Sequence, residues 1–166
     1  MKVCTDKNSV MSTDDVSMMR AGKSASFEIE MRVPYFDTDK MQVVHHANYV
    51  KYFEIARTEY FRQSGMAYSE MEKFGLQSPV LSIDVKYREP AVYDEIIILS
   101  CRMSKLGPAS MEFDYEVRNA ETGAKHVTGH SRHGIVNSEY RPVALKKKYP
   151  EVHEFLTGIF EKDNAE

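Results

Sequence analysis

The chain has 166 residues, of which 42% are hydrophobic and 28% are charged, and its net charge at pH 7 is −3. This composition is typical of one globular domain, and the slightly negative net charge argues weakly against nucleic acid as a partner. No apolar run approaches the roughly 18 residues that cross a membrane. The two cysteines, Cys4 and Cys101, provide neither a disulfide framework nor a zinc pattern, so we expect a reducing, cytoplasmic compartment.

Residues 1–25 differ from the rest of the chain because they contain no aromatic residue and no regular apolar spacing. They also lack the continuous apolar centre of a signal peptide. We therefore expect a flexible tail over residues 1–25, followed by one folded domain over residues 26–166. Met11, Met18 and Met19 are alternative starting points, so the native extent of the tail is open.

The first predicted strand contains four apolar residues that alternate with polar ones, the pattern of a strand with one buried face. These residues are Phe27, Ile29, Met31 and Val33. A loop over residues 35–46 then leads into a predicted helix over residues 48–64, whose apolar face is broad enough to be covered by a sheet. Asn48 is the expected N-cap, and Gly65 is expected to end the helix.

The rest of the chain is predicted to form mainly antiparallel strands. Strands are expected over residues 81–88, 96–103, 111–118 and 126–136, and shorter helices over 68–74 and 150–160. The apolar run at 96–99 indicates a central strand buried on both faces, and short loops with glycine at 105–109 and 119–125 indicate hairpins. About five antiparallel strands and one long helix predict an α+β fold with the sheet wrapped around the helix, whose free edges could pair between two copies.

Two acids and two histidines stand just before the long helix. Asp37, Asp39, His45 and His46 lie in the segment YFDTDKMQVVHHANYVKYFEIARTEY. An acid beside a helix N-terminus can attack a carbonyl or activate water, while free backbone N–H groups hold the oxyanion. On the residues alone, the two acids are better explained as turn formers and helix-end acids, and only the family likeness given below reverses that preference. A metal site is disfavoured, because adjacent histidines usually point apart and Met41 and Gln42 break a calcium-loop pattern.

This segment resembles the hotdog-fold acyl-CoA thioesterases of the 4-hydroxybenzoyl-CoA thioesterase type, and within them the subgroup that includes the Tol–Pal-associated thioesterase. The family pattern is Tyr-x-Asp-Thr-Asp-x-x-Gly-Val-Val-x-His-x-x-Tyr, followed by an acidic helix that carries an arginine. The matching residues are Tyr35, Asp37, Thr38, Asp39, Val43, Val44, His46, Tyr49, Glu54, Ala56, Arg57, Thr58 and Glu59. The segment VKYREPAVYDEIII extends the likeness, which runs from about residue 28 to residue 150.

The resemblance implies a hotdog fold, no metal or organic cofactor, and an active site at the interface of a dimer or tetramer. It makes Asp39 the nucleophile or general base, and the backbone N–H of His46 the oxyanion donor. Glu54 is an alternative acid, because a distant hotdog subgroup uses a helical glutamate, although a surface role suits it better. His126, His130 and His133 are expected to have ordinary surface or interface roles.

The sequence departs from the family at Gln42, where the usual residue is glycine. Glycine allows a positive φ and a close approach of the backbone to a ligand, so Gln42 could reshape the acyl pocket. Gln42, Val44 and His45 are the expected pocket residues. Coenzyme A carries phosphates, so basic residues should rim the pocket; the candidates are Lys86, Arg88, Arg102 and Lys105, each of which could instead be an ordinary surface charge.

Two rival functions stay open on the sequence. One is a thioesterase acting on acyl carrier protein, which would need a surface patch for an acidic protein. The other is an acyl-CoA-binding module without catalysis, against which the presence of Asp39 argues. The acyl group itself cannot be read from the residues, because Met-rich or Tyr-rich linings are not diagnostic.

Overall fold

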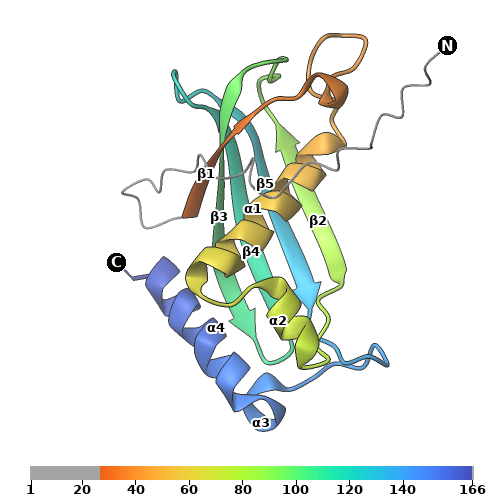
Figure 1. The fold of residues 1–166 in the computed structure, drawn as a ribbon, viewed down its shortest axis with the longest axis vertical. Helices are drawn as coiled ribbons and strands as arrows, with labels where there is room; N and C mark the ends of the chain where they lie inside the picture. The colour runs from red at the N-terminus through yellow and green to blue at the C-terminus, as the bar shows by residue number, and fades with distance from the viewer. Residues whose placement is uncertain (1–26, 166) are drawn as a thin grey trace, which may run out of the picture.

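The computed structural model describes residues 27–165, so the tail predicted for residues 1–25 lies outside the described part of the chain. A five-stranded antiparallel sheet in the order β1-β3-β4-β5-β2 wraps around one long helix, α1 (Figure 1). The strands are β1 (Phe27–Arg32), β2 (Val80–Tyr87), β3 (Ile96–Gly107), β4 (Ser110–Asn119) and β5 (Lys125–Gly134). The helices are α1 (Asn48–Ser64), α2 (Tyr68–Lys73), α3 (Leu145–Lys148) and α4 (Pro150–Asp163). The predicted α+β hotdog fold is therefore confirmed.

The inner face of the sheet carries the core. Alternating residues of β4 (Met111, Phe113, Tyr115 and Val117) are buried beneath α1. The same alternation holds on β3, where Ile97 and Leu99 are buried while Ile96 and Ile98 are only partly covered. The prediction that this strand is buried on both faces is wrong, because Ile96, Ile98 and Ser100 on the outer face are only partly covered by the described residues.

Helix α1 packs so closely on the sheet that β5 needs a glycine beneath it. The ring of Phe53 stacks on Tyr115 with 4.6 Å between centroids, and a Cβ added to Gly129 would lie 2.2 Å from the Phe53 ring. Gly129, which interrupts the apolar pattern of the last strand, is thus explained by this close approach. Phe53 and Gly129 together fix where α1 crosses the sheet.

The two ends of α1 differ from the prediction in one respect. Gly65 adopts a φ of 109°, the left-handed conformation expected after a helix. Ala47, not Asn48, is the N-cap residue, and it contributes no side-chain hydrogen bond. Asn48 is instead the first helical residue, and its side-chain amide donates to the backbone oxygen of Asp37 at 2.8 Å. The N-cap prediction for Asn48 is wrong, but the residue still ties the helix start to the loop.

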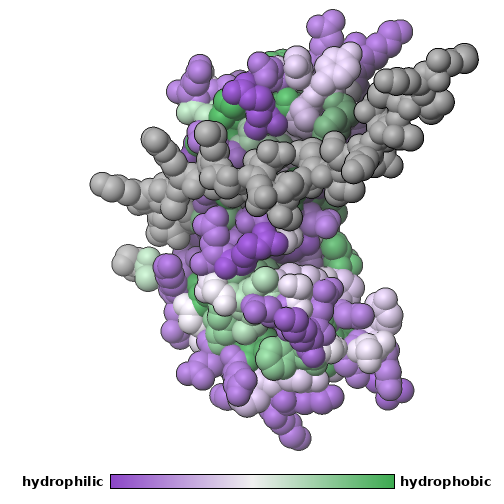
Figure 2. All heavy atoms as spheres, in the orientation of Figure 1, coloured by the Kyte–Doolittle hydropathy of each residue, from purple (hydrophilic) through white to green (hydrophobic). Residues whose placement is uncertain are grey.

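Strand β2 is an edge strand whose apolar side chains are exposed. Val80, Leu81, Ile83 and Tyr87 are all exposed, with Leu81 at 57% and Tyr87 at 52%. Apolar surface follows this edge in the space-filling view (Figure 2). The alternating pattern predicted the strand correctly, but not that its apolar face stays uncovered in one protomer. Within the described residues, no helix is both long and apolar enough to cross a membrane.

Candidate active site

The loop after β1 forms a small hairpin that presents Asp39. Thr38 and Val44 form an antiparallel bridge, and within it the Asp39 N–H donates to Val43 O and the Gln42 N–H donates to Asp39 O, both at 2.9 Å. Gln42 has a φ of 65°, in the left-handed region that glycine tolerates best. The position where the family has glycine thus keeps a positive φ, although a side chain is present.

The Asp39 carboxylate is held by one oxygen. Its Oδ1 accepts a hydrogen bond from the Met41 N–H at 2.7 Å, which fixes the side chain against its own turn. Its Oδ2 has no hydrogen-bond partner among residues 27–165, and the residue is partly exposed. One oxygen anchors the group and the other is left for a substrate or a water.

Asp37, two residues earlier, has a different role. Its side chain is only 2% exposed, and it accepts hydrogen bonds from the Tyr52 hydroxyl at 2.8 Å and from the Lys51 ammonium group. Its backbone oxygen accepts from the His45 N–H at 2.9 Å, beside the bond from Asn48. All of these groups lie at the start of α1 or just before it. Asp37 therefore binds the loop to the helix.

His46 stands two residues before α1, next to the N-cap residue Ala47. Among the described residues, the backbone N–H of His46 has no acceptor, whereas the neighbouring Ala47 and Asn48 N–H groups donate back to His45. The His46 carbonyl oxygen accepts a hydrogen bond from the Tyr87 hydroxyl at 3.1 Å. The rings of His45 and His46 lie 4.2 Å apart, so the expectation that they point apart is wrong. The free N–H belongs to the same small loop as Asp39.

The other predicted binding residues are not all brought together. Gln42, Val44 and His45 share the Asp39 loop; Val44 is buried, and its N–H donates to Ala91 O at 2.9 Å. Lys86 and Arg88 flank Tyr87 at the same end of the sheet. Because strand side chains alternate, Lys86 projects from the face opposite Tyr87, away from His46.

Lys105 and Arg102 lie elsewhere in the protomer. The Asp39 loop follows Arg32, which pairs with Ile96 at the start of β3. Lys105 is nine residues further along β3, and nine residues of extended strand span roughly 30 Å. Lys105 pairs with Glu112 at 3.4 Å, and Arg102 pairs with Asp114 at 2.8 Å on the outer face. One protomer therefore does not bring these two cations to Asp39. Glu54 is exposed on α1, in keeping with a surface role.

Two of the three histidines on β5 are buried, which corrects the expectation of a surface role. His126 lies 2.6 Å from a carboxylate oxygen of Glu95, and His133 is completely buried on the inner face. His130 remains partly exposed, 2.8 Å from Asp114. Within residues 27–165, no group of three or more histidine, cysteine, aspartate or glutamate side chains is placed to hold a metal ion.

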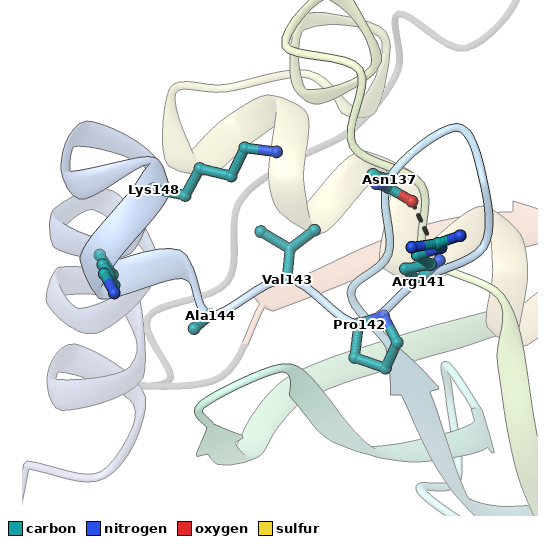
Figure 3. A pocket seen from close by; sticks show the side chains of 7 residues that line it. Asn137, Arg141, Pro142, Val143, Ala144 and Lys148 are labelled. Atoms are coloured by element: carbon teal, nitrogen blue, oxygen red, sulfur yellow. Dashed lines mark hydrogen bonds between the residues drawn. The ribbon is translucent and has the colours of Figure 1, made fainter.

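An open surface pocket lies at the opposite end of the sheet from Asp39. It has a volume of about 460 Å³ and is formed by the segment after β5 and by α3 (Figure 3). Its lining residues are Asn137, Arg141, Pro142, Val143, Ala144, Lys147 and Lys148. No residue of this segment was among the binding residues predicted from the sequence.

Comparison with known proteins gives consistent relatives. A family model described as the thioesterase superfamily matches residues 41–125, a stretch that begins just after Asp39. YneP of Bacillus subtilis, provisionally named an acyl-CoA thioesterase, is 32% identical over 125 residues, which cover 75% of this chain and 90% of YneP. The acyl-CoA thioester hydrolase YbgC of Escherichia coli is 32% identical over 57% of this chain and 71% of its own. The crystal structure of a DHNA-CoA thioesterase from Staphylococcus aureus superposes with a TM-score of 0.76 at 30% identity, covering 82% of this chain and 92% of that one.

Proposed function

The chain belongs to the thioesterase superfamily and is a thioester hydrolase, and from that premise we propose that it cleaves an acyl-CoA into a carboxylic acid and coenzyme A, with Asp39 as the catalytic carboxylate. YneP and YbgC, whose names state an acyl-CoA substrate, support this substrate class. We also propose, on the likeness of the motif from Tyr35 to Tyr49, that the chain belongs to the Tol–Pal-associated subgroup. We also assign it to the cytoplasm, in keeping with its two cysteines.

The observation that carries the proposal is the pair of free groups in the Asp39 loop. The Asp39 Oδ2 and the His46 N–H both lack partners in the described residues, while the atoms around them are hydrogen-bonded. An unpaired carboxylate oxygen and an unpaired peptide N–H in one small loop are what attack on a carbonyl needs. A single well-aimed donor of this kind contributes about 3 kcal/mol to transition-state stabilisation.

Two routes use these groups. In the first, Asp39 attacks the thioester carbonyl, the carbon–sulfur bond breaks, and the thiolate leaves and takes up a proton. Water then hydrolyses the mixed anhydride and restores the carboxylate. In the second, Asp39 removes a proton from a water that attacks directly, and that proton ends on the departing thiolate. In both, the His46 N–H stabilises the oxyanion.

We further propose that two copies pair through β2 to complete the site. Asp39 is partly exposed in one protomer, and the apolar side chains of β2 are uncovered. An exposed apolar edge strand is a surface that proteins normally cover. Because a two-fold axis would pair β2 with its own copy in antiparallel fashion, both acyl sites would lie at the interface.

A thiol-release screen tests the activity. We expect the purified protein to release coenzyme A from members of a panel of aromatic, short-chain and medium-chain acyl-CoAs, DHNA-CoA included. The Asp39→Asn variant should lose at least about a hundredfold in kcat while its circular dichroism is unchanged. Unchanged turnover in a folded Asp39→Asn protein would disprove the role of Asp39.

Two further measurements separate the rivals. Matched acyl groups on acyl carrier protein should give a lower kcat/KM than on coenzyme A, and the reverse order would favour the carrier protein as substrate. Tight binding of acyl-CoA without thiol release would favour a binding module. A single turnover in ¹⁸O-labelled water should place ¹⁸O in Asp39 if the carboxylate is the nucleophile and water attacks the Asp39 carbonyl of the anhydride; trapping of the acyl-enzyme anhydride identifies the nucleophile if water attacks the acyl carbonyl instead.

A further inference from the structure

The pocket at the far end of the sheet is lined by two lysines without carboxylate partners among the described residues and by one arginine whose partner is exposed. No carboxylate within residues 27–165 lies within 4.0 Å of the ammonium groups of Lys147 or Lys148, and Arg141 pairs only with the exposed Glu139 of its own loop at 3.3 Å. Figure 3 shows Arg141 and Lys148 on opposite sides of the pocket, with Val143 between them. A hollow of about 460 Å³ with positive charge on two sides suits an anionic group.

Hydrogen bonds close the backbone of the loop that supplies Arg141. The side chain of Asn137 accepts hydrogen bonds from the Glu139 N–H at 3.0 Å and the Arg141 N–H at 2.9 Å, and the Asn137 and Tyr140 backbones close the same turn. Tyr140 at its tip is 72% exposed and has a φ of 58°. A bulky residue held at positive φ on a well-bonded loop is a feature that clusters at binding sites. These bonds hold the backbone of Arg141, and its exposed side chain extends from that point.

In one protomer this pocket is too far from Asp39 to serve it. Gln77 and Val136 exchange backbone hydrogen bonds at 2.8 and 2.9 Å, which fixes the pocket segment beside the first residues of β2. Asp39 lies near the other end of that strand, where Tyr87 contacts His46. The eight residues of β2 separate the two ends by roughly 25 Å.

Antiparallel pairing of β2 with its own copy removes this separation. Such pairing brings the Val80 end of one strand next to the Tyr87 end of the other, about 5 Å away. The loop between β5 and α3 projects past the β2 edge, toward the side on which a second copy would pair (Figure 1). The pocket of one protomer would then adjoin the Asp39 loop of the partner subunit.

We propose that this pocket binds the phosphate groups of the coenzyme A whose thioester lies at Asp39 of the partner subunit, with Arg141 and Lys148 as the main contacts. The inference rests on the proposed acyl-CoA substrate and on the β2-paired dimer. The pantetheine arm separates the thioester from the phosphates, so the two ends of one substrate need two separate sites. Arg141 suits bidentate contact with a phosphate, and Lys148 adds a point charge.

The first test compares substrates with and without phosphates. The double variant Arg141→Ala/Lys148→Ala should lower the ratio of kcat/KM for acyl-CoA to that for the same acyl group on phosphate-free pantetheine by about tenfold or more, mostly through KM. The control Lys162→Ala removes an exposed charge from the last turn of α4, which does not line the pocket, and should keep the wild-type ratio. An unchanged ratio in the pocket variant would overturn the inference.

The second test asks whether the pocket acts on the partner's site. A heterodimer of one Asp39→Asn chain and one pocket-variant chain has an intact Asp39 facing an intact pocket only if the two act across the interface. At low acyl-CoA we then expect about half the wild-type rate, since one of two equivalent sites survives. A rate no higher than half that of the pocket-variant homodimer would show that pocket and Asp39 act within one chain and would refute the arrangement.

Binding of coenzyme A itself separates this inference from the proposed function. In calorimetry, coenzyme A should bind the wild type and the Asp39→Asn variant equally, and should bind the pocket variant at least about tenfold more weakly. If no acyl-CoA is hydrolysed but this pattern holds, the catalytic proposal fails and the phosphate site stands. If acyl-CoA is hydrolysed and the pocket variant binds coenzyme A as the wild type does, only the phosphate site fails.

Discussion

The hydroxyl of Tyr87 donates a hydrogen bond to the carbonyl oxygen of His46 across 3.1 Å. Tyr87 is the last residue of the exposed edge strand, and its ring also meets those of His46 and Tyr49 edge to face, at 6.4 and 5.8 Å between centroids. The start of α1 is thus tied to β2. Any contact that orders the β2 edge, such as a second copy, would also order the peptide proposed to hold the oxyanion.

Removing the Tyr87 hydroxyl should impair catalysis more than folding. A neutral hydrogen bond contributes about 1 kcal/mol, so Tyr87→Phe should lower kcat about fivefold with little change in KM. Tyr93→Phe is the matched control, because the hydroxyl of exposed Tyr93 has no hydrogen bond among the described residues. Equal kcat values for wild type and Tyr87→Phe would show that this contact does not position His46.

Substitution of Asp37 should mainly reduce stability, whereas substitution of Asp39 should mainly reduce activity. Asp37→Asn weakens the buried contacts to Tyr52 and Lys51 and should lower the free energy of unfolding by about 2 kcal/mol. The half-exposed Lys51 accounts for the smaller part of this loss. Asp39→Asn can keep the bond from the Met41 N–H and should change stability by less than about 0.5 kcal/mol. Urea denaturation of both variants measures the difference, and equal losses would contradict the assigned roles.

The strands and helices were predictable because their apolar spacing is a local property. The alternation from Phe27 and the helical spacing after Asn48 are both visible in a few residues, and the structure confirms the elements. Burial in the assembled sheet is not local. The outer face of β3 is only half covered and β2 lies at an edge, and neither fact can be read from the alternating residues themselves.

Only the site residues that lie within the sequence motif could be predicted. The motif placed Asp39 and His46 in one loop, and the structure adds the bonds that distinguish Asp39 from Asp37. The contact between Tyr87 and His46 joins residues 41 positions apart, and the pocket around Arg141 depends on how the last strand meets β2. No spacing rule within a single sequence reports such long-range neighbours.

Replacing Gln42 with glycine should leave the stability of the protein unchanged or raise it. Gln42 has a φ of 65°, a conformation that costs a residue with a side chain about 1 kcal/mol and that glycine adopts without this cost. Glycine also makes the unfolded chain more flexible, which cancels part of the stabilisation. Gln42→Gly should therefore raise the free energy of unfolding by up to about 0.5 kcal/mol. Gln42→Val, with a β-branched side chain, should lower it by more than about 1 kcal/mol. Chemical denaturation checks both, and a destabilised glycine variant would contradict the strain.

His133 should make the protein sensitive to mild acid. Its Nε2 lies 2.7 Å from the Ser131 hydroxyl, which in turn lies 2.8 Å from the Tyr115 hydroxyl. Arg57 donates a hydrogen bond to the Tyr115 hydroxyl at 3.2 Å. Burial, and then the positive charge of Arg57, lowers the pKa of His133 from 6.5 to about 4. The folded protein therefore keeps this imidazole neutral at pH values where the unfolded chain protonates it.

The lowered pKa of His133 determines both the direction of the stability change and the pH range over which it occurs. The contribution of His133 to stability is complete above pH 6.5 and is lost as the pH falls toward 4, by about 3 kcal/mol in all. Denaturation curves of wild type and His133→Gln between pH 7 and pH 4 should converge as the pH falls. Parallel curves would contradict the shift, and an NMR titration of the imidazole measures the pKa directly.

The β2 edge should decide both assembly and activity. Ile83 projects an exposed apolar side chain from the middle of this strand, so Ile83→Asp would bury two like charges near the axis of a β2-paired dimer. Sedimentation should show a dimer or a multiple of it for the wild type and a single protomer for Ile83→Asp, with thiol release lost in parallel. Ser82→Asp adds the same charge on the opposite face of the strand and should leave the dimer intact, because that face stays in water. A wild type that sediments as one protomer yet turns over acyl-CoA would show that Asp39 works without a partner, and would remove the basis for sharing the site between two copies.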